Sequence, residues 1–555
     1  MSRLLDLCAL AALVLAALRH ALVPPVPRPA TAPSADFSAD RAMAHVETLA
    51  AAPRPTGSAA HDRARAYLVN ELQALGLETQ LQEALQTGMR YARTGLVRNV
   101  VGRLHGTGPG GGRTAVLLVA HYDGVAGSQA AGDDASGVAA ILEALRALSA
   151  GTPPAHDIIA LFTDAEEDGL LGAVAFVQRH PWSRDVGVVI NLEARGGGGR
   201  SLMFETGPGN LEVVRAFGDH AAHPTASSLF YALYQLLPND TDFTELKALD
   251  VPGLNFAFIG RVAAYHTGLD TPARLDRGSV QHHGEEVLAL ARHFGAEGPP
   301  PHDRGDAAFF SLPFAGLVVW PLAWRWPILA VAAVSLLGST VAAVRRRLFS
   351  GWAPVIGLGL CLLVTLFALA GALGFRLLLG RVLGPEGAIP IPSPVSLTLA
   401  PLALGLTLSL LGLRLARQWA APEGVMAGAA AMWLGLGVLL AAKLPAGFYL
   451  FAVPGLAAAV GLVGYAALGS TLARGVAQWA AAATVVLLVV PILALGYLGL
   501  GTAGIAVAAS AALVALSLFL AAPLVAALDG FRWWVLPAVT LLLTAGLSAW
   551  ALGGA

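Results

Sequence analysis

The stretch TAVLLVAHYD at residues 114–123, followed by GDDASG at residues 132–137, decides the fold of the first half of the chain. An apolar run leads into His121, and residues 136–150 have the apolar spacing of a helix. An apolar strand, a polar loop and a helix in this order predict one unit of an α/β sheet. Such sheets bind ligands beyond the carboxyl ends of their strands, so polar residues there are candidates for a site.

The same alternation continues through residues 36–300. Strand-like runs lie at Thr114–Ala120, Asp157–Thr163, Val186–Asn191, Ser201–Glu205 and Gly253–Ile259, and helical patterns at 38–51, 59–76, 136–150, 209–221 and 280–294. Helices that alternate with apolar strands predict an α/β sheet covered on both faces. The TGPGGG turn at residues 107–112 precedes a strand and does not open a helix, which argues against a nucleotide-binding loop.

Composition divides the chain into two parts. Of its 555 residues 56% are hydrophobic and only 13% are charged, where a soluble domain carries about 25% charged residues. Most acidic residues and histidines lie before residue 304, and the rest of the chain is mostly Leu, Ala, Val and Gly. The net charge of -1 gives no reason to expect a nucleic-acid partner. The two cysteines, Cys8 and Cys361, lie in apolar stretches, so the soluble domain has no disulfide or thiolate ligand.

The apolar part predicts a membrane domain of about eight helices, with the lipid bilayer as its partner. Its apolar stretches lie near 326–344, 353–379, 396–415, 424–441, 446–467, 476–497, 501–526 and 531–552. Residues 4–23 are also long enough to cross a bilayer, and we favour an uncleaved anchor over a cleaved signal peptide. The predicted parts are an anchor at 1–24, a Pro-rich linker at 25–37, a soluble domain at 38–300, an interfacial connector at 301–325 and the membrane domain at 326–555.

Basic residues predict the orientation, because short loops rich in Lys and Arg stay in the cytoplasm. The strongest basic cluster, Arg345–Arg347, directly follows the second predicted span. This order places the soluble domain on the exoplasmic side. The Ala- and Gly-rich spans with short loops favour a bacterial inner membrane with a periplasmic domain, and an endoplasmic-reticulum or vacuolar membrane with a lumenal domain is the alternative.

Five polar clusters, most of them after apolar runs, have the residue types of a two-metal hydrolase: His121-Tyr-Asp123, Asp133-Asp134, Glu166-Glu167, Glu193 and Tyr265-His266. A ligating imidazole commonly donates its second N–H to a carboxylate, which suits His-x-Asp. A carboxylate of the Asp-Asp pair can bridge two cations, or Asp134 or Ser136 can simply cap the helix that follows. Adjacent glutamates at a strand end point in different directions, so one can ligate while the other faces a bound water. Each cluster alone is more often structural, and only their combination indicates a reaction class.

The order of these motifs resembles the di-zinc aminopeptidase and carboxypeptidase family. The motifs are His-x-Asp, Gly-Asp-Asp-x-Ser-Gly, Glu-Glu-x-Gly-Leu-x-Gly, Asn-Leu-Glu and Tyr-His-Thr, and the resemblance covers about 40–300. The segment Pro238-Asn-Asp-Thr-Asp-Phe243 is also similar to that family. One anchor, a peptidase domain and eight spans resemble its multi-pass membrane branch of endoplasmic-reticulum metallopeptidases and vacuolar membrane proteases. This resemblance implies a zinc-exopeptidase mixed sheet sandwiched by helices, beside an all-α multi-pass membrane domain.

The resemblance also implies two zinc ions per chain and a role for each polar residue. His121 and Glu193 would hold one ion, Glu167 and His266 the other, and Asp133 would bridge them. Glu166 would be the general base, Asp123 would orient His121, and Tyr265 would donate to the developing oxyanion. The Asp133–Asp134 peptide bond would be cis. Glu193 departs from the soluble aminopeptidases, which usually have Asp there, and its longer side chain would alter the spacing or affinity of the metals.

The expected function is therefore a zinc exopeptidase, most simply an aminopeptidase, that acts on peptide substrates. Three alternatives remain open: a one-zinc enzyme similar to glutaminyl cyclase, a binding protein with an inactive peptidase domain, and a transport function of the membrane domain. The sequence does not predict the oligomeric state or the preferred terminal residue.

Overall fold

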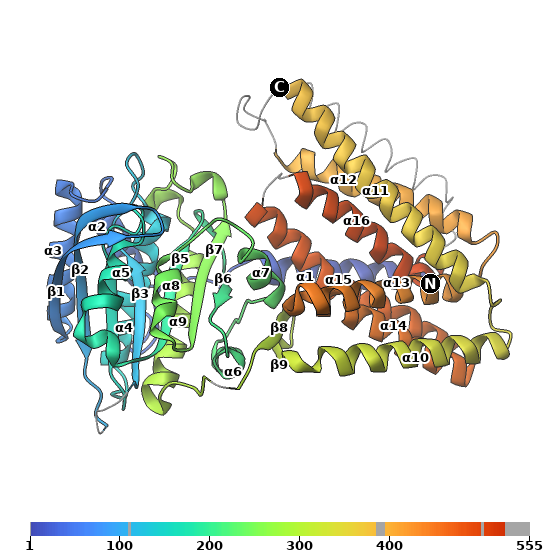
Figure 1. Cartoon of the computed structure of the whole chain (residues 1–555), viewed down its shortest axis with the longest axis horizontal. Helices are drawn as coiled ribbons and strands as arrows, with labels where there is room; N and C mark the ends of the chain where they lie inside the picture. The colour runs from blue at the N-terminus through green and yellow to red at the C-terminus, as the bar shows by residue number, and fades with distance from the viewer. Residues whose placement is uncertain (1, 109–112, 303, 384–393, 501–503, 528–555) are drawn as a thin grey trace. The chain divides into compact units, whose positions relative to one another are not determined.

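The protein is described here from a computed structural model that covers residues 2–108, 113–302, 304–383, 394–500 and 504–527. These residues form two compact units, one of residues 22–322 and one of residues up to 21 together with those from 323 onward. The first unit contains the mixed sheet and its helices, and the second is helical (Figure 1).

The first unit is built on a seven-stranded sheet with the order β1-β2-β4-β3-β5-β7-β6. Its four central strands, β4, β3, β5 and β7, run parallel, and β1, β2 and β6 pair antiparallel at the two edges. The strands are β1 (Glu78–Gly88), β2 (Arg93–Leu104), β3 (Ala115–His121), β4 (Ile158–Thr163), β5 (Val186–Ala194), β6 (Gly198–Thr206) and β7 (Gly253–Gly260). The five strands predicted from the sequence are all present, and the β1–β2 hairpin was not predicted.

Helices cover both faces of this sheet, because the side chains of the central strands are apolar on both faces. In β3, Val116, Leu118 and Ala120 belong to the core that includes α2, α4 and α9, and Leu117 and Val119 belong to the opposite core beneath α5 and α8. The helices are α2 (Ala39–Leu49), α3 (Ala59–Ala74), α4 (Gly137–Ser149), α5 (Leu171–Arg179), α6 (Leu211–His220), α7 (Ser228–Tyr234), α8 (Asp242–Leu246) and α9 (Arg277–Glu297). The predicted α/β fold with helices on both faces is confirmed.

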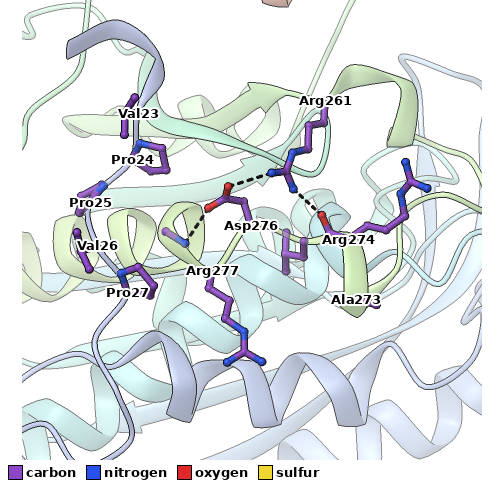
Figure 2. Close-up of a pocket in the computed structure, with 12 residues that line it drawn as sticks. Val23, Pro24, Pro25, Val26, Pro27, Arg261, Ala273, Arg274, Asp276 and Arg277 are labelled. Carbon is purple, nitrogen blue, oxygen red and sulfur yellow. Dashed lines mark hydrogen bonds and ion pairs between the residues drawn. The ribbon is translucent and has the colours of Figure 1, made fainter. Parts of the chain in front are cut away.

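The Pro-rich segment after residue 22 packs along this unit. The backbone N–H of Arg28 donates to Gln281 on α9 over 2.9 Å, and the ring of Phe37 fills the space beside Gly284, where a Cβ atom would lie 2.0 Å from it. Val23–Pro27 also line an open hollow of about 740 Å³ together with Arg261 and residues 273–278 (Figure 2). None of the predicted metal ligands lines this hollow. The segment that we interpreted as a linker is therefore part of the folded unit.

Residues beyond 300 also belong to the first unit. Strands β8 (Ala307–Leu312) and β9 (Gly316–Pro321) form a hairpin, and Phe309 is fully buried in the main core of the unit. The compact unit thus ends at Leu322 and not at the predicted boundary near residue 300. The β8–β9 hairpin lies within the stretch 301–325, for which an interfacial connector was predicted.

The second unit is made of apolar helices at the positions where spans were predicted. They are α1 (Ser2–Leu22), α10 (Arg325–Arg345), α11 (Ala353–Leu383), α12 (Pro394–Ala416), α13 (Pro422–Lys443), α14 (Tyr449–Leu468), α15 (Thr471–Leu500), α16 (Gly504–Leu520) and α17 (Ala522–Ala527). Within the described part of the chain, five helices are long and apolar enough to cross a membrane, and segments of α1, α12 and α16 form shorter apolar helices. The predicted span at 531–552 lies outside the described residues.

Candidate metal centre

The parallel strands bring the predicted residues together at one edge of the sheet. His121 is the last residue of β3, Glu166 and Glu167 follow β4, Glu193 is the last but one residue of β5, and Tyr265 and His266 follow β7. In the register of the sheet, His121 is paired with Thr163 at the end of β4. Because the carboxyl ends of parallel strands meet at one edge, four chain segments that are distant in sequence converge there.

Asp133 lies between the two histidines of this cluster. Its Oδ1 is 3.1 Å from Nε2 of His121, and its Oδ2 is 3.1 Å from Nε2 of His266. It belongs to the turn Ala131–Ser136 before α4, and the Asp133–Asp134 peptide bond is cis. Each oxygen of this carboxylate therefore faces a different imidazole, which is the arrangement of a bridging ligand.

A further carboxylate completes each half of the cluster. Glu193 Oε2 lies 3.8 Å from His121 Nε2, and Glu167 Oε1 lies 3.0 Å from His266 Nε2. In the groups His121–Asp133–Glu193 and Asp133–Glu167–His266, the candidate ligand atoms lie within 4.8 Å of one another. Glu166 forms a third such group with His121 and Glu167, without Asp133. The geometry offers two adjacent three-ligand sets that share Asp133.

Asp123 lies behind the ligands and orients them. Its Oδ1 is 3.3 Å from Nδ1 of His121, and its two oxygens accept the backbone N–H groups of Glu166 and Glu167, each over 3.2 Å. A proton on Nδ1 would be held by this carboxylate, which leaves the Nε2 lone pair facing Asp133. Asp123 thus contacts one imidazole and the backbone that carries both glutamates, a position that suits a residue that orients ligands.

Asp134 has the other role that was considered for the Asp-Asp pair, which is to cap the helix that follows. Its Oδ1 accepts the backbone N–H of Gly137 over 2.9 Å at the start of α4, and a Cβ atom at position 137 would lie 2.4 Å from its Oδ2. Ser136 makes no side-chain capping bond and donates to Gly132 O instead. Asp134 is therefore the residue that caps the helix.

The electrostatics of the cluster favour bound cations. Burial raises the pKa of Glu166 and of Glu193 well above the ordinary glutamate value, and neighbouring carboxylates raise it further. Burial opposes ionisation of Asp133 as well, but its contacts with His121 and His266 outweigh that effect and lower its pKa. Buried carboxylates this close together are stable as anions only with compensating positive charge. Two imidazoles and oxygen donors are a ligand set that suits zinc.

The cluster is more open on one side than on the other. The side chain of His121 is 1% exposed and that of Glu193 is 9% exposed, whereas that of His266 is 36% exposed. The ring of Tyr265 stacks on the ring of His266, with 3.8 Å between their centroids, and burial raises the pKa of its phenol, which therefore stays protonated at neutral pH. A substrate would reach the His266 side of the cluster first.

Three polar residues next to the cluster had no predicted role, although Asp242 lies in the segment 238–243 that is similar to the family. Asp242, at the start of α8, accepts a hydrogen bond from Thr163, and burial raises its pKa to about 7. Asp270 accepts the backbone N–H of Asp133, and Arg54 donates to Ala130 O in the loop before Asp133. Asp270 follows His266 by four residues, which was a usable signal; Arg54 lies far away in sequence, between two prolines, and offered none.

Known proteins share this domain. Residues 99–291 match the model of Peptidase family M28. Endoplasmic reticulum metallopeptidase 1 of Mus musculus is 32% identical over 308 residues, which cover 51% of this chain and 34% of that protein. Vacuolar membrane protease of Candida albicans is 33% identical over 278 residues, which cover 49% of this chain and 32% of that protein. The matches thus span about a third of the length of these relatives.

A solved structure also matches the first unit. A Zn-dependent exopeptidase from Parabacteroides distasonis is 23% identical and covers 46% of this chain and 98% of its own, with a TM-score of 0.37. The family match covers strands β3 to β7 and all five candidate metal ligands. The chain is therefore a multi-pass membrane protein that carries a Peptidase family M28 domain.

Proposed function

We propose that this protein is a zinc-dependent exopeptidase, most simply an aminopeptidase, that hydrolyses peptides with two zinc ions per chain. The observation that supports this most directly is the position of Asp133, whose two oxygens each face a different histidine with a further carboxylate beside it. His121 and Glu193 would hold one ion, Glu167 and His266 the other, and Asp133 would bridge both. A two-metal site of this kind activates water and polarises the scissile carbonyl.

Three further residues would supply proton transfer, orientation of the ligands and stabilisation of the oxyanion. Glu166 lies within reach of His121 and Glu167 but is not grouped with Asp133, so it is free to take a proton from the attacking water and to give one to the leaving amine. Asp123 holds His121 and the backbone of both glutamates in place. Tyr265, with a protonated phenol on the open side, would donate to the oxyanion of the tetrahedral intermediate.

A peptide screen with the detergent-purified full chain tests the reaction class. Peptides with a free N-terminus should lose their first residue, N-acetylated copies should remain intact, and a chelator should abolish the cleavage until zinc is restored. Cleavage of the acetylated peptides from the C-terminal end would make the enzyme a carboxypeptidase. Cyclisation of an N-terminal glutamine without hydrolysis would favour the one-zinc alternative.

Metal analysis tests the ligand assignment. The wild type should contain close to two zinc ions per chain, Asp133→Ala should lose both, and His266→Ala should mainly lose one, because only Asp133 faces both histidines. His105→Ala is a matched control, since that side chain is 62% exposed and pairs with Glu78 at the edge of the sheet. A fully active wild type with one zinc ion would contradict the two-metal proposal.

Substitutions of the adjacent Glu166 and Glu167 should have different effects, one on catalysis and the other on zinc binding. Glu167→Gln should lower zinc occupancy, because its carboxylate lies 3.0 Å from His266 Nε2. Glu166→Gln should keep both metals and lose general-base catalysis, so that kcat falls by about 10²–10⁴-fold with little change in KM. The reverse pattern, with zinc lost only from Glu166→Gln, would exchange the two roles.

We further propose that the peptidase domain lies on the exoplasmic side, in the periplasm of a bacterial cell or in the lumen of an organelle. The basic cluster Arg345–Arg347 at the end of α10 supports this orientation. A reporter that works only in the cytoplasm should stay silent when fused after residue 322 and give signal when fused after residue 347. Signal from the first fusion would overturn the orientation.

A further inference from the structure

A fully buried arginine lies behind the cluster of candidate ligands, and none of its hydrogen-bond partners among the described residues is a carboxylate. Arg54 is 0% exposed, and its guanidinium donates to three backbone carbonyls. Nε bonds to Tyr122 O over 2.7 Å, Nη1 to Gln129 O over 2.7 Å and Nη2 to Ala130 O over 2.9 Å. A buried cation loses its hydration, so this arrangement needs compensation from its surroundings.

The three carbonyls belong to the two segments that supply the first ligands. Tyr122 separates His121 from Asp123, and residues 129 and 130 lie in the loop that leads into Asp133. Ala130 has the left-handed φ of 53°, so its carbonyl depends on a backbone conformation that alanine rarely adopts. A single planar group with donors in a fixed fork therefore fixes the end of β3 relative to the loop of Asp133.

A carboxylate holds the same loop from the other side. Asp270 Oδ1 accepts the backbone N–H of Gly132 over 2.7 Å, and its Oδ2 accepts that of Asp133 over 3.2 Å. A Cβ atom at position 132 would lie 2.5 Å from Gly196 O and 3.1 Å from Asp270, so the close approach requires glycine. Because Asp270 follows His266 by four residues, it connects the loop of Asp133 to the segment of the last ligand.

Arg54 and Asp270 have opposite charges, and each charge suits the backbone groups that the residue contacts: Arg54 donates to carbonyls and Asp270 accepts from N–H groups. Burial lowers the pKa of Arg54, and the nearby carboxylates of Asp123, Asp133, Asp134 and Asp270 offset part of that effect. Asp270 accepts from backbone N–H groups, and hydrogen bonds to charged groups are about twice as strong as those between neutral groups. Neither residue belongs to the grouped candidate ligands, so both act through the backbone that carries the ligands.

We propose that Arg54 and Asp270 are positioning residues that hold Asp133 between His121 and His266 before any metal binds. The inference rests on the proposed two-metal function and adds to it the reason why Asp133 can serve both metals. Without this pair, the loop of residues 129–133 would be free to move relative to β3 on one side and to His266 on the other. Both metals would then bind more weakly, although every ligand is still present.

Zinc titration of the metal-free, detergent-purified full chain tests this. Arg54→Met and Asp270→Asn should each weaken zinc binding about 10–100-fold, the usual effect of removing a group that orients a ligand. Arg54→Lys keeps the charge but not the fork of donors, so it should recover only part of the affinity. At saturating zinc, kcat should fall and KM should change little, because both side chains are buried and act through the backbone of the ligand loops.

Arg103→Met is the matched control. This half-buried arginine also makes three side-chain hydrogen bonds, to Asp157 and Asp185, but none of its partners lies in the ligand loops. Its loss should lower the melting temperature of the metal-free protein without changing the zinc dissociation constants. A merely structural role of Arg54 would give this same pattern, whereas the proposal requires that the rise of the melting temperature on adding zinc becomes smaller.

The outcomes separate the two proposals. A wild type that binds zinc tightly, with folded Arg54→Met and Asp270→Asn variants of equal zinc affinity, would overturn the positioning role and leave the two-metal function intact. A wild type that binds no zinc would overturn both. Should Arg54→Met fail to fold, Arg54→Lys and Asp270→Asn carry the comparison, and wild-type zinc affinity in both would contradict the proposal.

Discussion

The first unit has to hold several buried carboxylates close together although they repel one another. Asp133, Glu167 and Glu193 lie within contact distance of two histidines, with Asp123 directly behind them and Glu166 beside them. No arrangement of apolar side chains could stabilise such a group, because buried anions need hydrogen bonds or cations. The repelling carboxylates of the peptidase domain therefore lie at one edge of its sheet, and the rest of the fold holds them in place.

The central parallel strands hold these carboxylates in place. Strands β3, β4, β5 and β7 are almost completely buried and packed on both faces, so their carboxyl ends have little freedom to move. The candidate ligands lie at or shortly after the ends of these strands, except Asp133, which lies in the turn before α4. The irregular spacing of the ligands in sequence follows from this, because the helices and edge strands between them differ in length while the strand ends remain adjacent.

The sequence was sufficient for the central sheet, since its strands are continuous apolar runs. It was not sufficient for the β1–β2 hairpin, because the pattern there is reversed: Leu81 and Leu85 are exposed, whereas Ala84 and Gln86 are buried. The ligand residues could be named because their motifs occur in a recognisable order, and the structure brings them together. Arg54 could not be found in this way, because an arginine between two prolines has the appearance of a surface loop and its burial depends on contacts across the whole domain.

The packing of the Pro-rich segment has a consequence for how this domain can be released or isolated. A spacer that is free in solution would let a protease, or a choice of expression boundaries, separate a membrane helix from an intact enzyme. Here Arg28 and Phe37 pack against α9, and a cut after them would remove one of the two backbone donors of Gln281 and leave an empty pocket beside Gly284. The peptidase domain and the Pro-rich segment before it thus form one folded unit, and an isolated form of that unit would have to begin close to residue 22.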